Sequence, residues 1–565
     1  MNRRKFQTGS HIILWGVIVC LVITCGIYES LMAATPLKEL VLAIGGENAE
    51  GYDPTLGWGR YGNPLFQSTL LRRDEQMNIV NDLATEYSLS PDRMIWKITL
   101  REDVRFSDGE LLTAEDVVYT FNMAAQSGGK VDLTMFEEAV VTGEYSLELR
   151  LKKPWITFAN YLITLGIVPK HAHGEEYGRN PIGSGPYKLV HWAEGQQMVV
   201  EANPLYYGEQ PQIKRLVFLF IDEDTSFAAA KAGKVHVVAV PQTLAIQDIP
   251  EMHVHLVKSV DNRGLMFPVI PDEGTKTADG DPIGNNVTAD PAIRKAVNYA
   301  IDRKALVEGV LEGFGTPAYS LVDGLPWEQP DARFEDGNLD KARQILADAG
   351  WKDTDGDGIL EKNGLKAEFS LIYSASDSTR QNLALASADM LKKIGIKADV
   401  QGKSWDDIEK LMHSCVIVFG WGSHDPTEMY NLYHSTMTGA GWYNTGYYSN
   451  PIVDKYLEQA MGAPSFEASL PYWKAAQWDG KTGFTTPGDA AWAWLVNLTH
   501  TYFVSDCLDV GQSQIEPHGH GWPINVHTGP VHQEHDVLGL AAGLGLGCAV
   551  GATDHHHLFS FLKET

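Results

Sequence analysis

The sequence predicts an α/β protein of at least two lobes, and two observations support this fold class. The first is length, since 565 residues exceed what a single hydrophobic core usually holds. The second is pattern, since short apolar runs typical of strands alternate with amphipathic runs typical of helices from Leu37 onward. With 44% hydrophobic and 21% charged residues, the composition is that of a globular protein.

The net charge makes one class of partner improbable. The formal charge at pH 7 is -27, which repels polyanions, so we expect no nucleic-acid partner. The acidity selects no particular ligand, because it serves solubility equally well.

The first 34 residues have the layout of a secretory signal peptide. Basic residues at 3–5 precede an apolar run at 12–28 without any Asp, Glu, Lys or Arg, and the small pair Ala33 and Ala34 follows. We therefore expect residues 1–34 to be removed by cleavage after Ala34.

Two other interpretations of this segment stay open. Residues 21–25 (LVITC) resemble a lipobox that would anchor Cys25, although Thr24 stands where a smaller residue is usual. The apolar run also lies at the short edge of the roughly 17 to 25 residues that span a bilayer as an uncleaved anchor. All three interpretations place the rest of the chain outside the cytoplasm, in the periplasm or anchored at the outer face of the cytoplasmic membrane.

A strand, a turn and a helix are predicted in the first half of the chain. Residues 96–100 (WKITL) alternate apolar and polar side chains, as a half-buried strand does. After a polar turn at 107–109, Thr113 can cap a helix and Asp116 can be its reciprocal partner in a capping box. The helix is expected to run through Phe121.

Three helices further along the chain carry start signals. Asp290 is a cap with Pro291 at the first helical position, and Asp302 can cap the next helix. A third helix is expected from near Asn338 to Gly350, the residue type that favours a left-handed C-terminal cap.

Four blocks, in order along the chain, resemble the signature of the family 5 solute-binding proteins of ABC importers. They are 96–122 (WKITLREDVRFSDGELLTAEDVVYTFN), 181–189 (PIGSGPYKL), 202–208 (ANPLYYG) and 290–307 (DPAIRKAVNYAIDRKALV). Several long ordered matches are more specific than one short motif, so the chain is identified as a member over roughly residues 38–526. This family serves dipeptide, oligopeptide and nickel importers.

The resemblance implies a large two-lobed periplasmic-binding-protein fold, the Venus flytrap, which closes over a ligand at its hinge. Lobe one would comprise 35–268 plus 492–526 and contain an inserted subdomain, and lobe two would comprise 269–491. The His- and Gly-rich tail at 527–565 departs from the family and is expected to be disordered. The resemblance also implies a monomer that works with an ABC permease and its ATPase subunits and needs no catalytic group.

By the same resemblance, the loop at 420–433 (GWGSHDPTEMYNLY) borders the ligand. Peptide-binding members carry an Asp shortly after the Trp that pairs with the α-amino group of the peptide. Here the loop is shorter, and this Asp is missing unless Asp425 replaces it. The shortened loop looks more like the nickel-binding branch, in which Trp and Tyr enclose a metal held by a small chelator. The candidate ligand-binding residues are Trp421, His424, Asp425, Tyr430 and Tyr433, and core packing is the alternative role for the three aromatic residues.

Arginine side chains are expected to hold the carboxylates of such a chelator. Arg60, together with its neighbour Tyr61, and Arg263 are the candidates, and a solvated surface charge is the alternative for each arginine.

Histidines are expected to complete the coordination of the metal. His500, His518 and His520 lie in the segment that should return to lobe one, and imidazole suits nickel well. A hydrogen-bonded structural histidine is the alternative role for each. The expected ligand is thus nickel with a small organic chelator, and no catalytic cofactor is expected.

The function that the sequence favours is capture of a nickel chelate, such as nickel-histidine, for ABC import. Capture of dipeptides or oligopeptides is the first alternative. The same fold could serve a chemoreceptor or a chaperone. A secreted peptide hydrolase is a further alternative, but no Walker loop, His-Glu-x-x-His motif or Gly-x-Ser-x-Gly elbow supports an enzyme.

Two other patterns have ordinary interpretations. Cys415 and Cys507 form a bridge in an oxidising compartment or remain two buried free thiols. Residues 353–358 (DTDGDG) resemble the start of an EF-hand loop, but the twelfth position is Gly364 instead of a bidentate Glu. A tight polar turn is therefore expected there.

Overall fold

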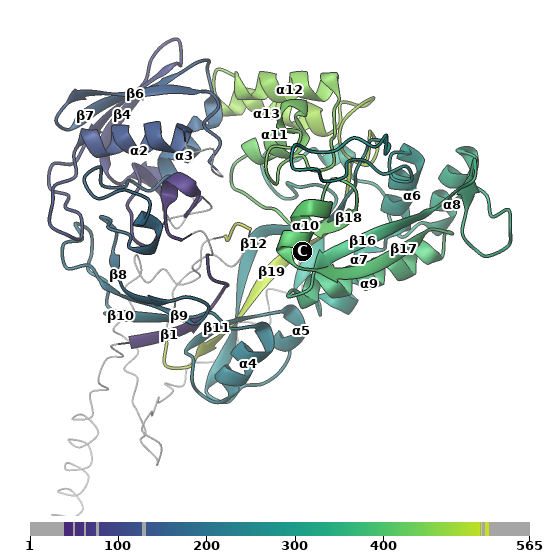
Figure 1. Ribbon diagram of the computed structural model, residues 1–565, viewed down its shortest axis with the longest axis horizontal. Coiled ribbons are helices and arrows are strands. Elements are labelled where there is room, and N and C mark those ends of the chain that lie inside the picture. Colours follow the sequence, from purple (N-terminus) through teal and green to yellow (C-terminus); the bar gives the residue numbers. More distant parts are fainter. Residues whose placement is uncertain are drawn as a thin grey trace, which may run out of the picture.

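The computed structural model describes most of the chain between residues 39 and 518. The described residues are 39–48, 51–60, 64–74, 78–126, 131–508, 510 and 515–518. The predicted signal peptide at 1–34, the tail at 527–565, Tyr61 and His520 lie outside them. The described part is mixed α/β, as predicted, with two lobes joined by two long central strands (Figure 1).

One sheet passes through both lobes and contains eleven strands among the described residues. The strands are β1 (Glu39–Ala43), β8 (Tyr187–Ala193), β9 (Gln197–Ala202), β10 (Arg215–Leu219), β11 (Val237–Val240), β12 (Met252–Met266), β13 (Gly315–Pro317), β16 (Glu368–Ser374), β17 (Lys397–Lys403), β18 (Val416–Phe419) and β19 (Trp492–Ser505). Their order is β17-β16-β18-β12-β19-β11-β1-β10-β9-β8, with β13 beside β19. Lobe one contains the β11 to β8 end of this sheet, and lobe two contains the β17 to β18 end.

Helices pack against this sheet in each lobe (Figure 1). In lobe one they are α4 (Glu223–Lys231) and α5 (Gln242–Ala245). In lobe two they are α6 (Pro291–Ala300), α7 (Arg303–Val310), α8 (Leu339–Asp348), α9 (Ser378–Lys392) and α10 (Trp405–Leu411). The shortest elements are β2 (Leu71–Arg73), β3 (Ile79–Asn81), β14 (Glu361–Lys362), β15 (Leu365–Lys366) and the 3-10 turns η1 (Pro54–Leu56), η2 (Ile156–Phe158), η3 (Tyr177–Arg179), η4 (Pro330–Ala332) and η5 (Ser435–Met437).

A separate four-stranded sheet forms the inserted subdomain of lobe one. It has the order β4 (Ala84–Leu89), β5 (Ile95–Leu100), β7 (Ser146–Leu151), β6 (Phe136–Gly143), and it packs with α2 (Ala114–Gln126) and α3 (Ala159–Thr164). Three helices of lobe two lie next to this subdomain: α11 (Thr427–Tyr433), α12 (Pro451–Met461) and α13 (Phe466–Gln477) (Figure 1). The hydroxyl groups of Thr427 and Thr157 are hydrogen bonded at 2.6 Å, and Arg93 Nη1 donates to the carbonyl of Gly462 at 3.0 Å, so the subdomain touches lobe two directly.

Strands β12 and β19 pair antiparallel across the whole junction of the lobes. Residues 252–258 pair with 499–505 beside β11 of lobe one, and residues 264–266 lie between β19 and β18 of lobe two. The register of β12 shifts between Lys258 and Asn262, so residues 259–261 form the passage between the lobes. The predicted lobe boundaries at 268 and 492 fall at the lobe-two ends of these two strands.

The predicted strand–turn–helix unit is confirmed. Residues 96–100 lie in β5 with alternating buried and exposed side chains. The backbone N–H of Thr113 donates to Asp116 Oδ2 at 2.9 Å, and Thr113 Oγ1 accepts from Glu115 N at 3.3 Å. The bond from Asp116 back to the cap is therefore formed as predicted, and the Thr113 hydroxyl caps the second helical N–H instead of the third.

The predicted start signals in lobe two are confirmed as well. The side chains of Asp290, Asp302 and Asn338 each accept a hydrogen bond of 2.9 Å from a backbone N–H in the first turn of α6, α7 and α8. Gly350 follows α8 with a φ of 88°, which a residue with a Cβ adopts only at a cost.

Arg303, at the start of α7, is a fully buried cation in lobe two. Its guanidinium donates to the carbonyls of Ala318 and Trp494, both at 2.7 Å, and to Asn298 Oδ1 at 2.9 Å. Asp336 is its acidic partner at 3.2 Å. One side chain thus ties α7 to β19 and to the segment after β13.

Replacing Arg303 by Met is expected to lower the free energy of unfolding by about 3 to 5 kcal/mol, because buried carbonyls and a carboxylate lose their donors. Arg333→Met is the matched control, since Arg333 is half exposed and its pair with Glu328 contributes at most about 1 kcal/mol. Urea unfolding of both variants measures the difference. Equal losses would contradict the structural role given to Arg303.

Candidate functional site

The predicted ligand loop packs against the passage of β12 between the lobes. Asn262 N donates to the carbonyl of Trp421 at 2.9 Å, and Trp421 N donates to Asn262 Oδ1 at 3.2 Å. A Cβ at Gly420 would lie 2.5 Å from the Asn262 carbonyl oxygen, and one at Gly422 would lie 2.2 Å from that of Val260. The two glycines therefore allow the close approach that brings Trp421 to the passage.

The segment at 515–518 returns to the same passage. Glu516 N donates to the Lys258 carbonyl at 2.9 Å, and Val260 N donates to the Glu516 carbonyl at 2.8 Å. His518 N donates to the carbonyl of Gly422 at 2.7 Å. Three segments thus meet at one place. They are β12, called the hinge strand below because it runs through both lobes, the loop at 420–433, and the returning segment at 515–518.

Asp261 lies at the centre of this meeting point and is only 1% exposed. Its Oδ1 accepts from Arg263 Nη1 and from His518 Nδ1, the latter at 2.7 Å, and its Oδ2 accepts from His500 Nε2 at 3.1 Å. Burial by itself would raise the pKa of Asp261, but the charges of Arg263 and His518 and the two histidine hydrogen bonds hold that pKa well below the usual range. Asp261 is therefore a carboxylate at neutral pH.

His500 bridges two carboxylates. Its Nε2 donates to Asp261 and its Nδ1 donates to Glu516, which also accepts from the Tyr502 hydroxyl at 2.8 Å. Burial alone would lower the pKa of His500. The hydrogen bonds and charges of the two carboxylates outweigh this effect and raise the pKa of His500 to about 9. Both nitrogens carry a proton, so the predicted role as nickel ligand lacks a lone pair and the alternative role as a hydrogen-bonded structural histidine fits this geometry.

Two guanidinium groups lie close to Asp261. Arg263 is on β12 and Arg380 is in the first turn of α9, and each side chain is 9% exposed. Each uses Nη1 for an acidic partner, Asp261 and Asp377 respectively. Burial lowers the pKa of Arg380, and the nearby charge of Arg263 lowers it further, so the two groups are near enough to repel each other.

The same two guanidinium groups keep unused donors. The Nε atoms of Arg263 and Arg380 are buried and have no hydrogen-bond partner among the residues that the structure describes. A buried donor without an acceptor costs free energy, so an incoming anion would find two prepared sites there. Arg380 was missed from the sequence, because an Arg three residues after the cap Asp377 looks like any exposed helical residue.

The two acidic residues of the loop differ in their partners. Asp425 Oδ1 accepts from the backbone N–H and the hydroxyl of Thr427, at 2.9 and 2.7 Å, just before α11, and the ligand contact predicted for it stays a prediction. Glu428, in the first turn of α11, accepts only from Gly422 N at 3.3 Å. Burial raises the pKa of Asp425 to about 6 and that of Glu428 to about 8.

The aromatic residues of the loop divide between the passage and the core. Trp421 is 7% exposed and lies against Tyr443, with ring centroids 5.6 Å apart. Tyr433 stacks on Phe484 at 3.7 Å, is 1% exposed and accepts from Trp494 Nε1 at 3.1 Å. These contacts are those of core packing, the alternative role given for Tyr433, and its ligand-binding role stays a prediction.

Tyr430 points to a different neighbourhood. Its ring stacks on His434 with centroids 4.2 Å apart, and its hydroxyl lies 3.4 Å from Thr436 Oγ1. These contacts belong to the α11 to η5 segment, and none of them joins Tyr430 to the residues around Asp261.

His424 keeps one ring nitrogen available. Its Nε2 donates to the Ile515 carbonyl at 2.9 Å, which assigns the proton to that nitrogen. Burial lowers the pKa of His424 to about 4, so the ring is neutral at neutral pH and Nδ1 keeps its lone pair. No hydrogen bond within the described ranges uses that Nδ1 atom. Arg60, on the lobe-one side, is near enough for its charge to lower the pKa of Glu428.

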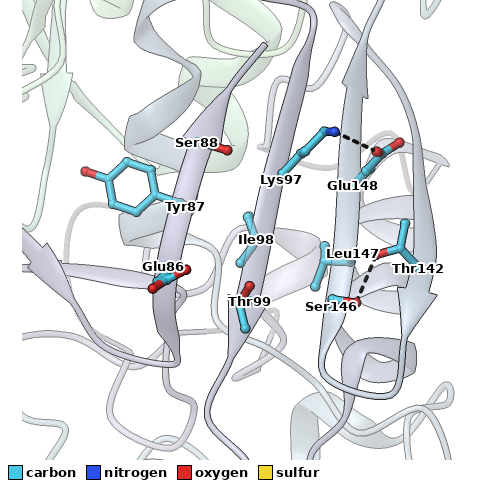
Figure 2. Close-up of a pocket in the computed structure, with 10 residues that line it drawn as sticks. All are labelled: Glu86, Tyr87, Ser88, Lys97, Ile98, Thr99, Thr142, Ser146, Leu147 and Glu148. Atoms are coloured by element: carbon cyan, nitrogen blue, oxygen red, sulfur yellow. Dashed lines mark hydrogen bonds and ion pairs between the residues drawn. The ribbon is translucent and has the colours of Figure 1, made fainter.

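Two other features of the surface lie apart from this site. A pocket of ≈ 390 Å³ is lined by residues of β4 to β7, among them Tyr87 and the pair Lys97–Glu148 at 3.9 Å (Figure 2). It contains none of the predicted site residues. Cys415 and Cys507 are both free and both half-buried, so the bridge is absent and the thiols are less buried than expected.

The DTDGDG segment forms an acidic turn. One carboxylate oxygen from each of Asp353, Asp355, Asp357 and Glu361 lies within 4.8 Å of the others. The Lys366 ammonium lies 3.0 Å from Asp355 and also contacts Asp357, so a side chain of the protein supplies positive charge to the cluster.

Comparison with known proteins finds similarity along most of the chain. Residues 78–444 match the model of the bacterial extracellular solute-binding proteins, family 5, middle region. The sequence is 31% identical over 497 residues to Protein XP55 of Streptomyces lividans, covering 85% of this chain and 87% of that protein. It is 30% identical over 420 residues to the oligopeptide-binding protein AppA of Bacillus subtilis, covering 70% and 75%.

Solved structures are similar over comparable lengths. NikZ from Campylobacter jejuni in complex with Ni(L-His) superposes with a TM-score of 0.77 at 24% identity, covering 87% of this chain and 99% of NikZ. AppA from Bacillus subtilis in complex with a nonapeptide superposes with a TM-score of 0.71 at 25% identity, covering 85% and 97%. One fold thus accommodates a metal complex in one protein and a peptide in another.

The His500 bridge is expected to make stability depend on alkaline pH. The folded-state pKa is raised above that of an unfolded histidine, so the stabilisation is complete below about pH 6.5 and is lost as the pH rises through about 9. The free energy of unfolding should fall by on the order of 3 kcal/mol across this range in the wild type and by less in His500→Gln. His253→Gln, at a half-exposed histidine, is the control in urea unfolding. Parallel pH profiles for the wild type and His500→Gln would contradict this assignment.

Proposed function

The chain belongs to the bacterial extracellular solute-binding proteins of family 5, as the four sequence blocks predicted, and we propose that it captures short peptides for an ABC importer. Proteins of this family bind a solute and work with an ABC permease and its ATPase subunits. The choice among peptide, nickel chelate and other solutes depends on the groups around Asp261.

The observation that carries the proposal is the pair of incompletely used guanidinium groups, Arg263 and Arg380. A carboxylate accepts two parallel hydrogen bonds from a guanidinium, and such charge-assisted bonds are stronger than neutral ones. The α-carboxylate at the C-terminus of a peptide fits this chemistry. Because Arg263 is on the hinge strand and Arg380 is on lobe two, a carboxylate held by both would favour one arrangement of the lobes.

Two further observations favour a peptide over a nickel chelate. A relative that is 30% identical over 420 residues is an oligopeptide-binding protein, AppA of Bacillus subtilis. Both ring nitrogens of His500, the leading candidate nickel ligand, are protonated and hydrogen bonded to carboxylates. Main-chain hydrogen bonds and charged termini are the usual means of holding an extended peptide.

Nickel bound to a small chelator remains the second candidate, and His424 is the observation that favours it. A neutral imidazole with a free Nδ1 and a hydrogen-bonded Nε2–H is the form in which histidine binds metals. The carboxylate of a chelating amino acid could use the same two arginines. His518 has the same kind of arrangement, because its Nδ1–H donates to Asp261 at 2.7 Å and burial lowers the pKa of its imidazole.

We further propose that the protein acts outside the cytoplasm as a monomer and binds its ligand without chemical change or a catalytic cofactor. In the part of the chain that the structure describes, no helix is long and apolar enough to cross a membrane.

Retention of a peptide library tests the carboxylate site. The wild type is expected to retain free-acid di- to pentapeptides and to bind the C-terminally amidated library at least about tenfold more weakly, a difference of about 1.4 kcal/mol or more. Arg380→Ala should bind both libraries equally weakly, because one of the two carboxylate partners is gone. Arg343→Ala, at a half-exposed arginine of α8, is the control. Mass spectrometry of the peptides that remain after desalting gives the result, and equal retention of acids and amides would refute the carboxylate role.

Calorimetry with nickel plus L-histidine tests the second candidate. If the complex binds, His424→Asn is expected to weaken it by about tenfold or more, because the amide cannot replace the Nδ1 lone pair at the metal. Binding should also fade as the pH falls and the imidazole is protonated. A wild type that binds nickel-histidine and retains no peptide would replace the peptide proposal with this one.

A further inference from the structure

Glu223, the first residue of α4 in lobe one, binds the start of α9 in lobe two. The hydroxyl of Ser378 donates to Glu223 Oε2 at 2.6 Å, and the backbone N–H of Ser378 is a second donor to the same carboxylate. Both residues are half-buried. Because neither belongs to β12 or β19, this contact joins the two lobes in addition to the strands that run between them.

The next residue of α9 is also bonded to lobe one. The hydroxyl of Thr379 donates to Gln242 Oε1 at 3.3 Å, and Gln242 is the first residue of α5. Gln242 is itself buried and fixed, because its Nε2 donates to the carbonyl of Thr499 on β19 at 3.0 Å. Two consecutive residues at the start of α9 thus have partners in lobe one.

The order of strands and helices places this contact at the ligand-facing edge of each lobe. In lobe one β10 is parallel to β1, and α4 follows the carboxyl end of β10. In lobe two β16 is parallel to β17 and β18, and α9 follows the carboxyl end of β16. Ligands of open α/β sheets bind outside the carboxyl ends of the parallel strands. Glu223 and Ser378 therefore meet across the space between these two edges.

The carboxylate of Glu223 lies at the N-termini of two helices. It belongs to the first residue of α4 and accepts from the first residue of α9. The N-terminus of a helix has a partial positive charge, so two such ends repel each other unless negative charge lies between them. Glu223 has both helix ends as neighbours only while the lobes are together, so its interactions favour that arrangement over a separated one.

Arg380 lies in the same turn of α9, directly after Thr379. Its Nε has no partner among the described residues, and the charge of Arg263 on the hinge strand is near enough to act on it. The repulsion between these two cations opposes the approach of α9 to the hinge strand. The bonds of Ser378 and Thr379 to lobe one offset this repulsion and hold Arg380 in place through its own backbone.

We propose that Glu223 is a positioning residue that latches α9 to lobe one and so slows the escape of a bound ligand. It acts through α9 and Arg380 and needs no contact with the ligand itself. The inference rests on the proposed capture of peptides and goes beyond it, because the time for which the lobes stay together then depends on a group outside the ligand contacts.

A double-mutant cycle of Glu223→Ala and Ser378→Ala tests the latch in the full-length protein. After loading with the free-acid di- to pentapeptide library, Glu223→Ala should lose peptide at least about fivefold faster than the wild type, because a hydrogen bond to a charged group is gone. Adding Ser378→Ala to Glu223→Ala should have no further effect, since the partner is already absent. Mass spectrometry after timed dialysis gives the rates.

Asp224→Ala is the matched control. It removes the same charge from the same turn of α4, but at an exposed residue. It should therefore lose peptide at the rate of the wild type. A loss as fast as that of Glu223→Ala would overturn the latch, because the effect would then come from the charge of the helix end alone.

The latch and the peptide function fail in different ways. If the wild type retains peptide and Glu223→Ala retains it equally long, or if the effects of the two substitutions add, the latch is overturned and the peptide function stands. If the wild type retains no peptide, the peptide function is overturned and urea unfolding of the same four proteins decides on the latch. A double variant that loses less free energy of unfolding than the two single variants together supports it, and additive losses overturn it.

Discussion

A buried negative charge at the junction of the lobes constrains the rest of the site. Asp261 lies in the short passage where β12 leaves one lobe for the other, and an uncompensated carboxylate there would cost several kcal/mol. Its three donors come from the same strand, from β19 and from the returning segment near residue 518. Satisfying this one group therefore requires three parts of the chain that are far apart in sequence to meet.

The arrangement around Asp261 also determines what the site can bind. Arg263 gives one nitrogen to Asp261, which fixes the guanidinium but leaves its Nε without a partner. Arg380 is held in the same way by Asp377, and the two cations stay close although they repel each other. Each guanidinium of the pair has its own carboxylate, which offsets the repulsion between the two cations. The proposed anion site would thus be formed before a ligand binds.

Features decided by neighbours in sequence were predictable, and features decided by distant partners were not. The caps at Asp290, Asp302 and Asn338 need only the next few residues, and the family could be identified from contiguous blocks. His500 and Tyr433 were assigned to the ligand, but their surroundings are set by Asp261 and Phe484, which lie 239 and 51 positions away. Arg380 was missed because its closeness to Arg263 and Asp261 is visible only in the folded chain.

The pairing of β12 with β19 has a mechanical consequence. Two runs of paired residues, 252–258 with 499–505 and 262–266 with 492–497, join β12 to β19 on either side of the register shift and resist sliding of one strand along the other. A two-stranded ribbon twists far more readily than it shears, and the irregular stretch at 259–261 is its least stiff section. The pairing of β12 with β19 thus holds the two lobes in a fixed relative position along the strand direction.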